Sequence, residues 1–475
     1  MRLLYVLGAL ATVSLTGLVV PGAGARRRAP HARSSPAASC GWVLEISGDQ
    51  ANVAFPDQAA RYWVAQLPIP PGFHIQLDGQ FPHARYMSFM TYDPATRAID
   101  GIHDSQIAPN PGSVNPFVAG ADRTAPNRSY RVYVVNGAIP GAGRAPNTIY
   151  TDNGKPPPQT KTSSPTHMTT LIYRVYEPDQ GESITGGEGL PRISLVADNG
   201  LAHVALGDCL SSALPSTQAL TDELAAAGTG AGSDSLPSAE LGGQDPPVWL
   251  KYTNMVNGVG NGVLNNPRTE AAWGPFQQAS NMLPTGGFYD NLDNAYMVAF
   301  DTASYGDIVV FHGKAPTTPQ TYLPSDTTMG TGQLRYWSMC SNMSTTQYLG
   351  CVMDDGVKLD SQGYYTIVIS TAANRPAVAR PACGIEWLPK GPLPSAPIIL
   401  RNMVPAPTFT QAIQDVPAQG QEQATLGPYY PQGYYFDHAS NFDGFVNANG
   451  GCSAFQWPYS SPPVSYRPAG LPGLG

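Results

Sequence analysis

The sequence predicts an all-β protein with little helix, built from two tandem, internally duplicated antiparallel β-sandwich units of a jelly-roll-like kind. Three observations lead to this prediction. Short apolar or alternating segments follow one another between turns rich in Gly (50 residues) and Pro (47 residues), only 13% of the residues are charged, and the chain repeats itself. Short strands joined by Gly- and Pro-rich turns are typical of antiparallel sandwiches or open barrels.

The repeat consists of segments that recur at a nearly constant spacing. The matched segments are Tyr62–Ala65 with Tyr296–Ala299, Arg85–Ser88 with Arg335–Ser338, and Tyr130–Val135 with Tyr364–Ile369. The offset is 234 positions in the first and third pairs and 250 in the second. Such a recurring period indicates a duplication. We expect two separate tandem units, and the competing arrangement is one larger pseudo-symmetric body in which both copies share a core.

The first 25 residues have the pattern of an export signal, with Arg2, an uncharged apolar run over 3–20 and the cleavage site Ala23-Gly24-Ala25. The mature chain then begins at Arg26, and the polar stretch 26–39 is expected to be a disordered leader. A membrane anchor is the alternative, which the arginines on the exported side disfavour. We therefore expect a secreted protein, extracellular or associated with the cell envelope, without stable membrane insertion after signal removal.

The charge balance argues against one class of partner. The formal net charge is -8, and removal of Arg2 with the signal makes it -9. An acidic chain without basic clusters is a poor binder of nucleic acid, and anionic membrane surfaces are disfavoured on the same ground. We expect no nucleic-acid partner.

The six cysteines, an even number in an exported chain, predict three disulfides rather than a metal site, since none of them has C-x-x-C spacing. A hairpin turn around 344–347 places Cys340 across from Cys351, within disulfide distance. Cys40 and Cys209 bracket the first unit. The remaining pair, Cys383 with Cys452, would hold the end of the chain to the second unit.

The first unit is predicted over 40–213 and consists of strands separated by turns. The expected strands are Gly41–Ile46, Tyr62–Leu67, Phe73–Leu77, Arg85–Tyr92, Tyr130–Val135, Met168–Tyr176 and Arg192–Ala197. They are short apolar runs or alternate between apolar and polar residues, as strands do. Asp93–Thr96 has the composition of a hairpin turn, and a loop rich in Gly, Pro and Asn follows Asp104.

Residues 214–246 have the composition of a flexible linker, in which Ser216–Ala227 can form a short helix. The second unit, 247–425, opens with a possible helix over Thr269–Met282. Within this unit Ile398–Arg401 echoes Leu171–Arg174 of the first. The remaining 426–475 form a tail rich in Tyr, Gly and Pro, which we expect to pack on the second unit.

Two Arg/Asp pairs are the sharpest candidate ligand site. If each hairpin is centred on its turn, Arg85 lies opposite Asp104 and Arg335 lies opposite Asp354. Each arginine shares a strand face with apolar side chains and must be paired, because an uncompensated buried charge costs several kcal/mol. Each pair is therefore either a structural ion pair or the lining of a pocket for an anionic or hydroxylated ligand. The arginines that could add a second cation to these pockets are Arg174 and Arg401.

The tail contains a concentrated aromatic patch. Its members are Tyr429, Tyr430, Tyr434 and Tyr435. If these rings are exposed, their flat faces could stack on sugar rings. If they are buried, they would close the open side of the second sandwich.

The sequence carries no motif of a catalytic or cofactor site. His74, His83 and His103 lack the spacing of a metal site, and no serine-hydrolase, P-loop or dinucleotide motif occurs in a strand–turn–helix context. Adjacent residues such as Asp354 and Asp355 in a turn are more typical of solvated or calcium-like ligands than of a glycosidase dyad. We expect no catalytic residue, no metal and no cofactor.

Several segments of the second unit carry a resemblance to known proteins. These segments are the Arg335–Ser338 hairpin, Gly363–Val368, Trp387–Pro389 and Ile399–Met403. Together they resemble an uncharacterised group of secreted β-rich proteins from mycobacteria and related actinobacteria. Phe81–Tyr86 of the first unit is similar to β-rich domains of unknown function in other bacterial proteins. The resemblance covers most of the mature chain, implies export and a β fold, and transfers no catalytic residue.

These observations favour a secreted, non-catalytic protein that binds a glycan or a lipid-like ligand at the cell envelope or outside it. The alternative is a secreted hydrolase or lyase that acts on envelope polysaccharide through the Arg/Asp pocket of one unit. A second alternative is a purely structural or adhesive protein. A binding pair should offer two similar surfaces, whereas a catalytic unit should have a cleft that its partner lacks.

Overall fold

The computed structural model describes residues 40–48, 52–152, 168–210, 244–254, 285–343, 346–392 and 395–458. The expected signal peptide, the leader 26–39 and most of the linker lie outside the described residues. So do the two expected helices, Ser216–Ala227 and Thr269–Met282.

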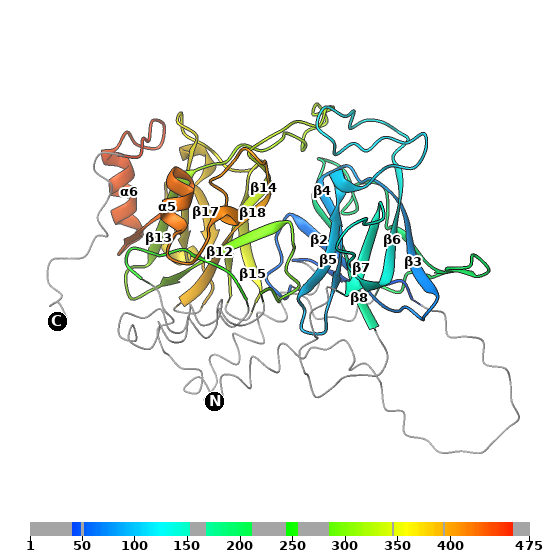
Figure 1. The fold of residues 1–475 in the computed structure, drawn as a ribbon. Coiled ribbons are helices and arrows are strands. Elements are labelled where there is room, and N and C mark those ends of the chain that lie inside the picture. Colours follow the sequence, from blue (N-terminus) through cyan, green and yellow to red (C-terminus); the bar gives the residue numbers. More distant parts are fainter. Residues whose placement is uncertain are drawn as a thin grey trace, which may run out of the picture. The chain divides into compact units, whose positions relative to one another are not determined.

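The first sandwich pairs two five-stranded sheets, with strand orders β1-β2-β8-β4-β5 and β10-β9-β3-β6-β7 (Figure 1). Its strands are β1 (Trp42–Ile46), β2 (Ala60–Pro68), β3 (Phe73–Gln80), β4 (Ala84–Tyr92), β5 (Ala98–His103), β6 (Ser129–Ala138), β7 (Thr148–Asp152), β8 (Met168–Pro178), β9 (Arg192–Ala197) and β10 (His203–Ala205). Alternate side chains of both sheets meet in one core, for example Trp63 and Phe89 from one sheet and Ile75 and Val132 from the other. This is the packing that period-two alternation predicts.

The second sandwich repeats this topology, with strand orders β11-β12-β18-β14-β15 and β17-β16-β13-β19. Its strands are β11 (Leu250–Lys251), β12 (Asn294–Thr302), β13 (Ile308–Lys314), β14 (Leu334–Asn342), β15 (Tyr348–Met353), β16 (Tyr364–Ser370), β17 (Glu386–Pro389), β18 (Ser395–Pro405) and β19 (Gln432–Phe436). The neighbours in space correspond strand by strand to those of the first sandwich. Pairing is antiparallel except between β6 and β7 and between β16 and β17. The predicted fold class, two duplicated β-sandwich units, is therefore confirmed.

Helices are few and short. They are η2 (Asp104–Gln106), η5 (Ala372–Asn374), η6 (Pro381–Cys383), η7 (Ile413–Asp415), α5 (Glu422–Leu426), η8 (Gly427–Tyr429) and α6 (Ala439–Ala448). The disulfides join Cys40 to Cys209, Cys340 to Cys351 and Cys383 to Cys452, which are the predicted pairs.

The match between β6 and β16 differs by one residue from the sequence alignment. In the first copy Gly79 of β3 lies opposite Tyr130, and in the second Gly313 of β13 lies opposite Tyr365. Tyr130 therefore corresponds to Tyr365 and not to Tyr364, as we expected. The correction matters because a shift of one residue moves every side chain of a strand to the other face.

The register that would place Arg85 opposite Asp104 and Arg335 opposite Asp354 is wrong by two positions, whereas the predicted pairing of Cys340 with Cys351 is confirmed. In the first hairpin the turn closes between Asp93 and Arg97, one residue later than expected, and a bulge follows between Thr91 and Tyr92. The pairing shifts in the same way in the second hairpin, where Ser338 lies opposite Met353. As a result, neither predicted Arg/Asp pair lies directly across its own hairpin.

The tail completes the second sandwich and covers its outer face. Its strand β19 pairs with β13, in the place that β9 takes beside β3. On the outer face Ile308 and Val310 of β13 are buried in a cluster with Phe442 of α6, whereas β3 carries His74 and Gln76 at the corresponding positions. An apolar outer face must be covered, and a polar one can face water. This difference explains why the tail packs on the second copy.

The two copies share a hydrophobic cluster. Its buried members are Ala60, Tyr86 and Tyr176 from the first copy and Tyr336 and Met403 from the second. Residues Cys40–Gly475 accordingly group as one compact unit. The described residues thus combine two sandwiches with the shared core that we considered as the competing arrangement.

Candidate functional site

The predicted arginines and aspartates form ion pairs, but the partners are exchanged between the copies. Arg85 of the first copy binds Asp354 of the second, and Arg335 of the second lies 3.1 Å from Asp104 of the first. Each guanidinium also donates to the backbone carbonyl of the other arginine, at 3.4 Å in both directions. The expected pairs, Arg85 with Asp104 and Arg335 with Asp354, are therefore not formed. The shifted register brings the Asp104 carboxylate instead to the backbone N–H of Met87, at 2.9 Å.

Arg85 has more carboxylate partners than Arg335. Besides Asp354 it contacts Asp355 at 2.6 Å and Glu177 at 3.1 Å. Burial raises the pKa of Glu177 well above its usual value, and Arg85 opposes that rise. Burial likewise raises the pKa of Asp354, which Arg85 and the Thr318 side chain oppose. One arginine thus contacts three carboxyl groups, and burial favours the protonated form of two of them.

At the corresponding place in the other copy, positive and negative charges are equal in number. By the offsets of the repeat, Ser105 stands where Asp355 stands, and Val404 where Glu177 stands. The backbone conformation supports the second correspondence, since Glu177 and Val404 both have a positive φ, 49° and 44°. Arg335 there meets the single carboxylate of Asp104. The two copies have therefore diverged in charge at equivalent positions.

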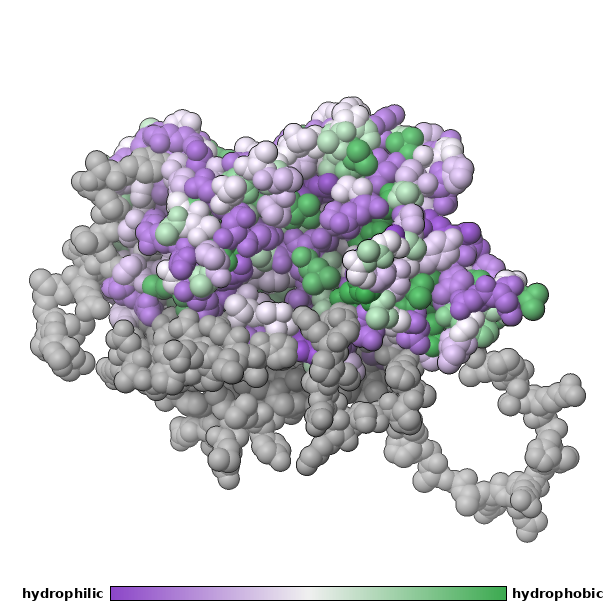
Figure 2. All heavy atoms as spheres, in the orientation of Figure 1, coloured by the Kyte–Doolittle hydropathy of each residue, from purple (hydrophilic) through white to green (hydrophobic). Residues whose placement is uncertain are grey.

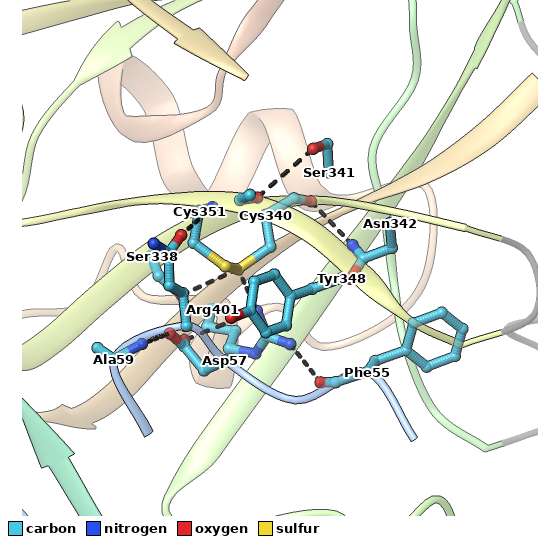
Figure 3. The surroundings of a disulfide bond; sticks show 12 residues. Phe55, Asp57, Ala59, Ser338, Cys340, Ser341, Asn342, Tyr348, Cys351 and Arg401 are labelled. Atoms are coloured by element: carbon cyan, nitrogen blue, oxygen red, sulfur yellow. Dashed lines mark hydrogen bonds and ion pairs between the residues drawn. A yellow bond between two sulfur atoms is a disulfide. The ribbon is translucent and has the colours of Figure 1, made fainter. Parts of the chain in front are cut away.

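A second set of contacts between the copies is made by the segment 52–59 of the first copy (Figure 3). The Asp57 carboxylate, which is fully buried, accepts hydrogen bonds from the hydroxyls of Tyr336 at 2.9 Å and Ser338 at 2.6 Å. Arg401 lies 3.7 Å from the same carboxylate and donates to the backbone carbonyl of Phe55 at 2.7 Å. Its other terminal nitrogen lies 2.9 Å from the sulfur of Cys340, in the disulfide of the second hairpin. A loop of the first copy therefore binds directly to the second.

The reciprocal contact uses the segment 286–293. Arg174 donates to the carbonyl of Tyr289 at 2.7 Å, as Arg401 does to Phe55. The segment also presents Asp293, which binds His103 at 2.9 Å and accepts from Tyr86 at 2.5 Å. Burial lowers the pKa of His103, but Asp293 outweighs this and raises it overall. We call the region where the two copies contact each other the junction. Because each copy contacts the other in the same way there, these contacts belong to the duplicated part of the fold.

The segments 52–59 and 286–293 have matching backbone conformations. Ala54 and Phe55 have φ of 63° and 54°, and Phe288 and Tyr289 both have 56°. Non-glycine residues rarely adopt the left-handed region, and when they do the surrounding contacts hold them there. Here the contacts come from the other copy, because Ala54 and Phe288 donate to the hydroxyls of threonines in the opposite hairpin turns.

The charged candidate residues face the junction and not an open surface. Arg85 and Asp104 are 0% exposed, Arg174 1% and Arg401 2%. The carboxylates that pair with these arginines and that sequence reasoning missed are Asp57, Glu177 and Asp355. Only Asp355 carried a signal, as one of two adjacent acidic residues in a turn. The others could not be found by spacing, because Asp57 pairs with an arginine of the other copy and Glu177 lies 92 positions from Arg85.

The four tail tyrosines divide into two kinds. Tyr430 and Tyr435 are buried in the core of the second sandwich, and their hydroxyls accept from the backbone N–H groups of Trp249 and Thr302. Tyr429 and Tyr434 are half-buried. Tyr429 packs edge-on against Phe409, with ring centres 5.0 Å apart. The buried pair closes the sandwich, which leaves the half-buried pair available to solvent.

His312 is enclosed by the tail and provides a test of that packing. Its ring stacks on Trp457 at 4.4 Å and on Tyr364 at 5.2 Å. Burial lowers the pKa of His312 from 6.5 to about 4, although Asp360 opposes the shift. The unfolded chain therefore takes up a proton at a higher pH than the folded chain. Stability from this group is present above about pH 6.5 and is lost as the pH falls toward 4.

We expect His312→Phe to flatten the pH dependence of unfolding. The phenyl ring keeps the aromatic stack and removes the titrating group. The free energy of unfolding of the wild type should fall by about 2 kcal/mol more than that of the variant between neutral pH and the mildly acid range. Urea unfolding followed by fluorescence at a series of pH values measures this difference. Parallel curves for the two proteins would show that His312 does not titrate as described.

The disulfides and the helices of the protein bear on its cellular location. Three disulfides suggest an extracellular or periplasmic location. No helix in the described ranges has the length and apolar character needed to cross a membrane. On the face drawn in Figure 2, hydrophilic and intermediate residues predominate, and hydrophobic residues occur in small separate groups.

The chain was compared with known families, sequences and structures. No protein-family model and no curated protein sequence matches it. Among solved structures it is similar to an uncharacterised protein from Burkholderia cenocepacia, at 12% identity and a TM-score of 0.41, covering 78% of this chain and 80% of that one. It is also similar to a structural-genomics target from Vibrio parahaemolyticus, at 13% identity and a TM-score of 0.35, covering 82% and 91%. The chain thus has structural similarity to uncharacterised bacterial proteins.

Proposed function

We propose that this protein is an exported, non-catalytic β-sandwich protein that binds a glycan at the cell envelope or outside it. The observation that carries the proposal is the surface around Tyr429. The Tyr429 ring is half-buried, and its hydroxyl accepts a hydrogen bond from the Gln333 side chain at 2.8 Å. The Lys314 ammonium lies 5.9 Å from the ring centre. We call these three side chains the Tyr429 patch.

The chemistry of the Tyr429 patch suits a sugar better than a lipid. An aromatic ring with a polar tip can stack on the apolar face of a sugar ring. The amide and ammonium beside it are donors for sugar hydroxyls. A lipid chain would instead require a larger continuous apolar surface, and here polar groups flank the ring. The patch therefore supports the glycan within the broader expectation of a glycan or lipid-like ligand.

Export and envelope association belong to the same proposal. The disulfides place the protein in an oxidising compartment, and the expected signal sequence supplies the route. The finer assignment, to an actinobacterial group of secreted proteins, rests on the resemblance of the second-unit segments alone.

A purely structural or adhesive role is the second candidate, and the buried ion pairs favour it. The charged residues that could have lined a pocket, among them Arg85 and Arg401, join the two copies. The same burial weighs against the alternative of a hydrolase or lyase that uses these residues, because substrate could not reach them without separating the copies.

We expect Tyr429→Ala to weaken retention on envelope polysaccharide by about tenfold, since one aromatic stacking contact is lost. The purified mature protein is incubated with an envelope preparation, and bound protein and released soluble sugar are measured together. Tyr434→Ala, which changes another half-buried tyrosine of the tail, is the matched control and should retain binding.

Each of the other possible outcomes leads to a different conclusion. Equal retention of the wild type and both variants would place the glycan site elsewhere and overturn the role of the Tyr429 patch. Release of oligosaccharide would identify an enzyme. Retention on lipid vesicles but not on polysaccharide would favour the lipid-like ligand, and retention on neither would support the structural role.

A further inference from the structure

We propose that Glu177, Asp354 and Asp355 form a divalent-cation site, suited to Ca²⁺, at the junction between the two copies. One oxygen from each of these side chains lies within 4.8 Å of the others. Ca²⁺ binds carboxylate oxygens at about 2.3–2.6 Å. A cation placed between the three oxygens can therefore contact all of them.

The orientation of Asp354 provides independent support. Its side chain is 2% exposed, and Arg85 binds its Oδ2. Its Oδ1 is buried and has no well-formed hydrogen bond in the described part of the chain, although the Thr318 side chain lies near enough to stabilise the carboxylate. A buried carboxylate oxygen without a partner is costly, and a metal ion would satisfy it. Arg85 contacts Oδ2 of Asp354, Oδ2 of Asp355 and Oε2 of Glu177, so each carboxylate keeps a second oxygen that this arginine does not contact.

The charge of the cluster matches a divalent ion. Three carboxylates surround one guanidinium, so the cluster carries two negative charges in excess when all groups are ionised. The side chains are 7% exposed for Glu177 and 12% for Asp355, so little water screens this charge. Asp355 is the most exposed of the three.

The duplication supplies an internal comparison. At the equivalent place of the other copy, Arg335 and Asp104 form a balanced pair, with Ser105 and Val404 in place of the two additional carboxylates. The two additional carboxylates are therefore present at one copy of the junction and absent from the other, where a single ion pair suffices. A divalent cation would balance their charge.

The site favours Ca²⁺ over Mg²⁺. Mg²⁺ requires near-ideal octahedral geometry and retains several waters, which a buried site fixed by an arginine leaves little room for. Ca²⁺ accepts irregular arrangements of carboxylate oxygens.

The experiment uses the full mature protein, stripped with a chelator and dialysed into metal-free neutral buffer. CaCl₂ and MgCl₂ are titrated separately by calorimetry, and thermal unfolding is recorded with and without each ion. We expect one Ca²⁺ site per chain, weaker binding of Mg²⁺ and a rise of about 4 °C in the unfolding midpoint with Ca²⁺.

The decisive variant is Asp355→Ser, which installs the residue of the other copy and should preserve the fold. Its affinity for Ca²⁺ should fall by about tenfold or more. Asp198→Asn removes a surface carboxylate that is paired with His74, and it should bind Ca²⁺ as the wild type does. Absence of saturable binding by the stripped wild type would show that protons and not a cation balance the cluster. Equal affinity of the wild type and Asp355→Ser would place the ion elsewhere, and either result overturns the proposal.

Discussion

Replacement of Arg85 by methionine is expected to lower the free energy of unfolding by about 5 kcal/mol, the largest effect of any single substitution discussed. Methionine fills much of the space of the arginine stem but carries no charge. Glu177, Asp354 and Asp355 then lose the cation that each of them contacts. Breaking a buried pair costs more than the pair contributes, because the remaining charge is left in a poorly hydrated place. Urea unfolding in the presence of a chelator, at neutral pH, measures the loss.

Arg335→Met is the matched control, because it removes the equivalent arginine of the other copy. Its partner Asp104 keeps hydrogen bonds from the backbone N–H groups of Met87 and Ser105. We therefore expect a loss of only about 2 kcal/mol. Equal losses for the two variants would show that the excess of carboxylates around Arg85 does not matter. The loss for Arg85→Met should also shrink as the pH is lowered, since protonated carboxyl groups need no counter-charge.

Much of the fold follows from local sequence pattern. The longer strands, the duplication and the disulfide pairs were predicted because alternation, turn composition and repeat spacing can be recognised in short segments, whereas edge strands such as β7 and β19 were not predicted. Register was predicted less well. One additional turn residue and a bulge at Thr91 shifted the hairpin pairing, and neither feature has a clear signal in composition. The one-residue error at Tyr130 arose because neighbouring tyrosines, Tyr364 and Tyr365, are equally good matches in sequence.

The candidate site was predicted as a set of residues but not as an arrangement. Retention of Arg85 and Arg335 in both copies showed correctly that they must be paired. A repeat does not show in which copy the partner lies, because an arginine can pair with the aspartate of its own unit or with the equivalent aspartate of the other unit. That choice depends on how the sandwiches dock, which is decided by tertiary contacts such as the shared cluster around Tyr86 and Tyr336.

Asp57→Asn is expected to lower the free energy of unfolding by about 4 kcal/mol, the second largest effect. The amide has nearly the shape of the carboxylate and can still accept one hydrogen bond from Tyr336 or Ser338. It cannot neutralise Arg401, which is 2% exposed. Burial lowers the pKa of Arg401, while Asp57 and nearby tyrosines raise it overall, so the guanidinium stays charged. Denaturant unfolding of both proteins, with the surface variant Asp198→Asn as control, measures the difference.

The other copy shows why the outcome of this substitution is informative. Asn291 occupies the place of Asp57 there, and no carboxylate among the described residues forms an ion pair with the buried Arg174. Arg174 lies instead over the rings of Tyr62 and Tyr92, at 5.5 and 5.4 Å, and donates to a backbone carbonyl. Arg401 lies over the ring of Tyr296, at 5.9 Å. If Asp57→Asn costs less than about 1 kcal/mol, ring and carbonyl contacts suffice to hold a buried arginine at this junction. A loss near the expected value would mean that the two copies hold equivalent arginines by different means, one by a carboxylate and the other by aromatic faces.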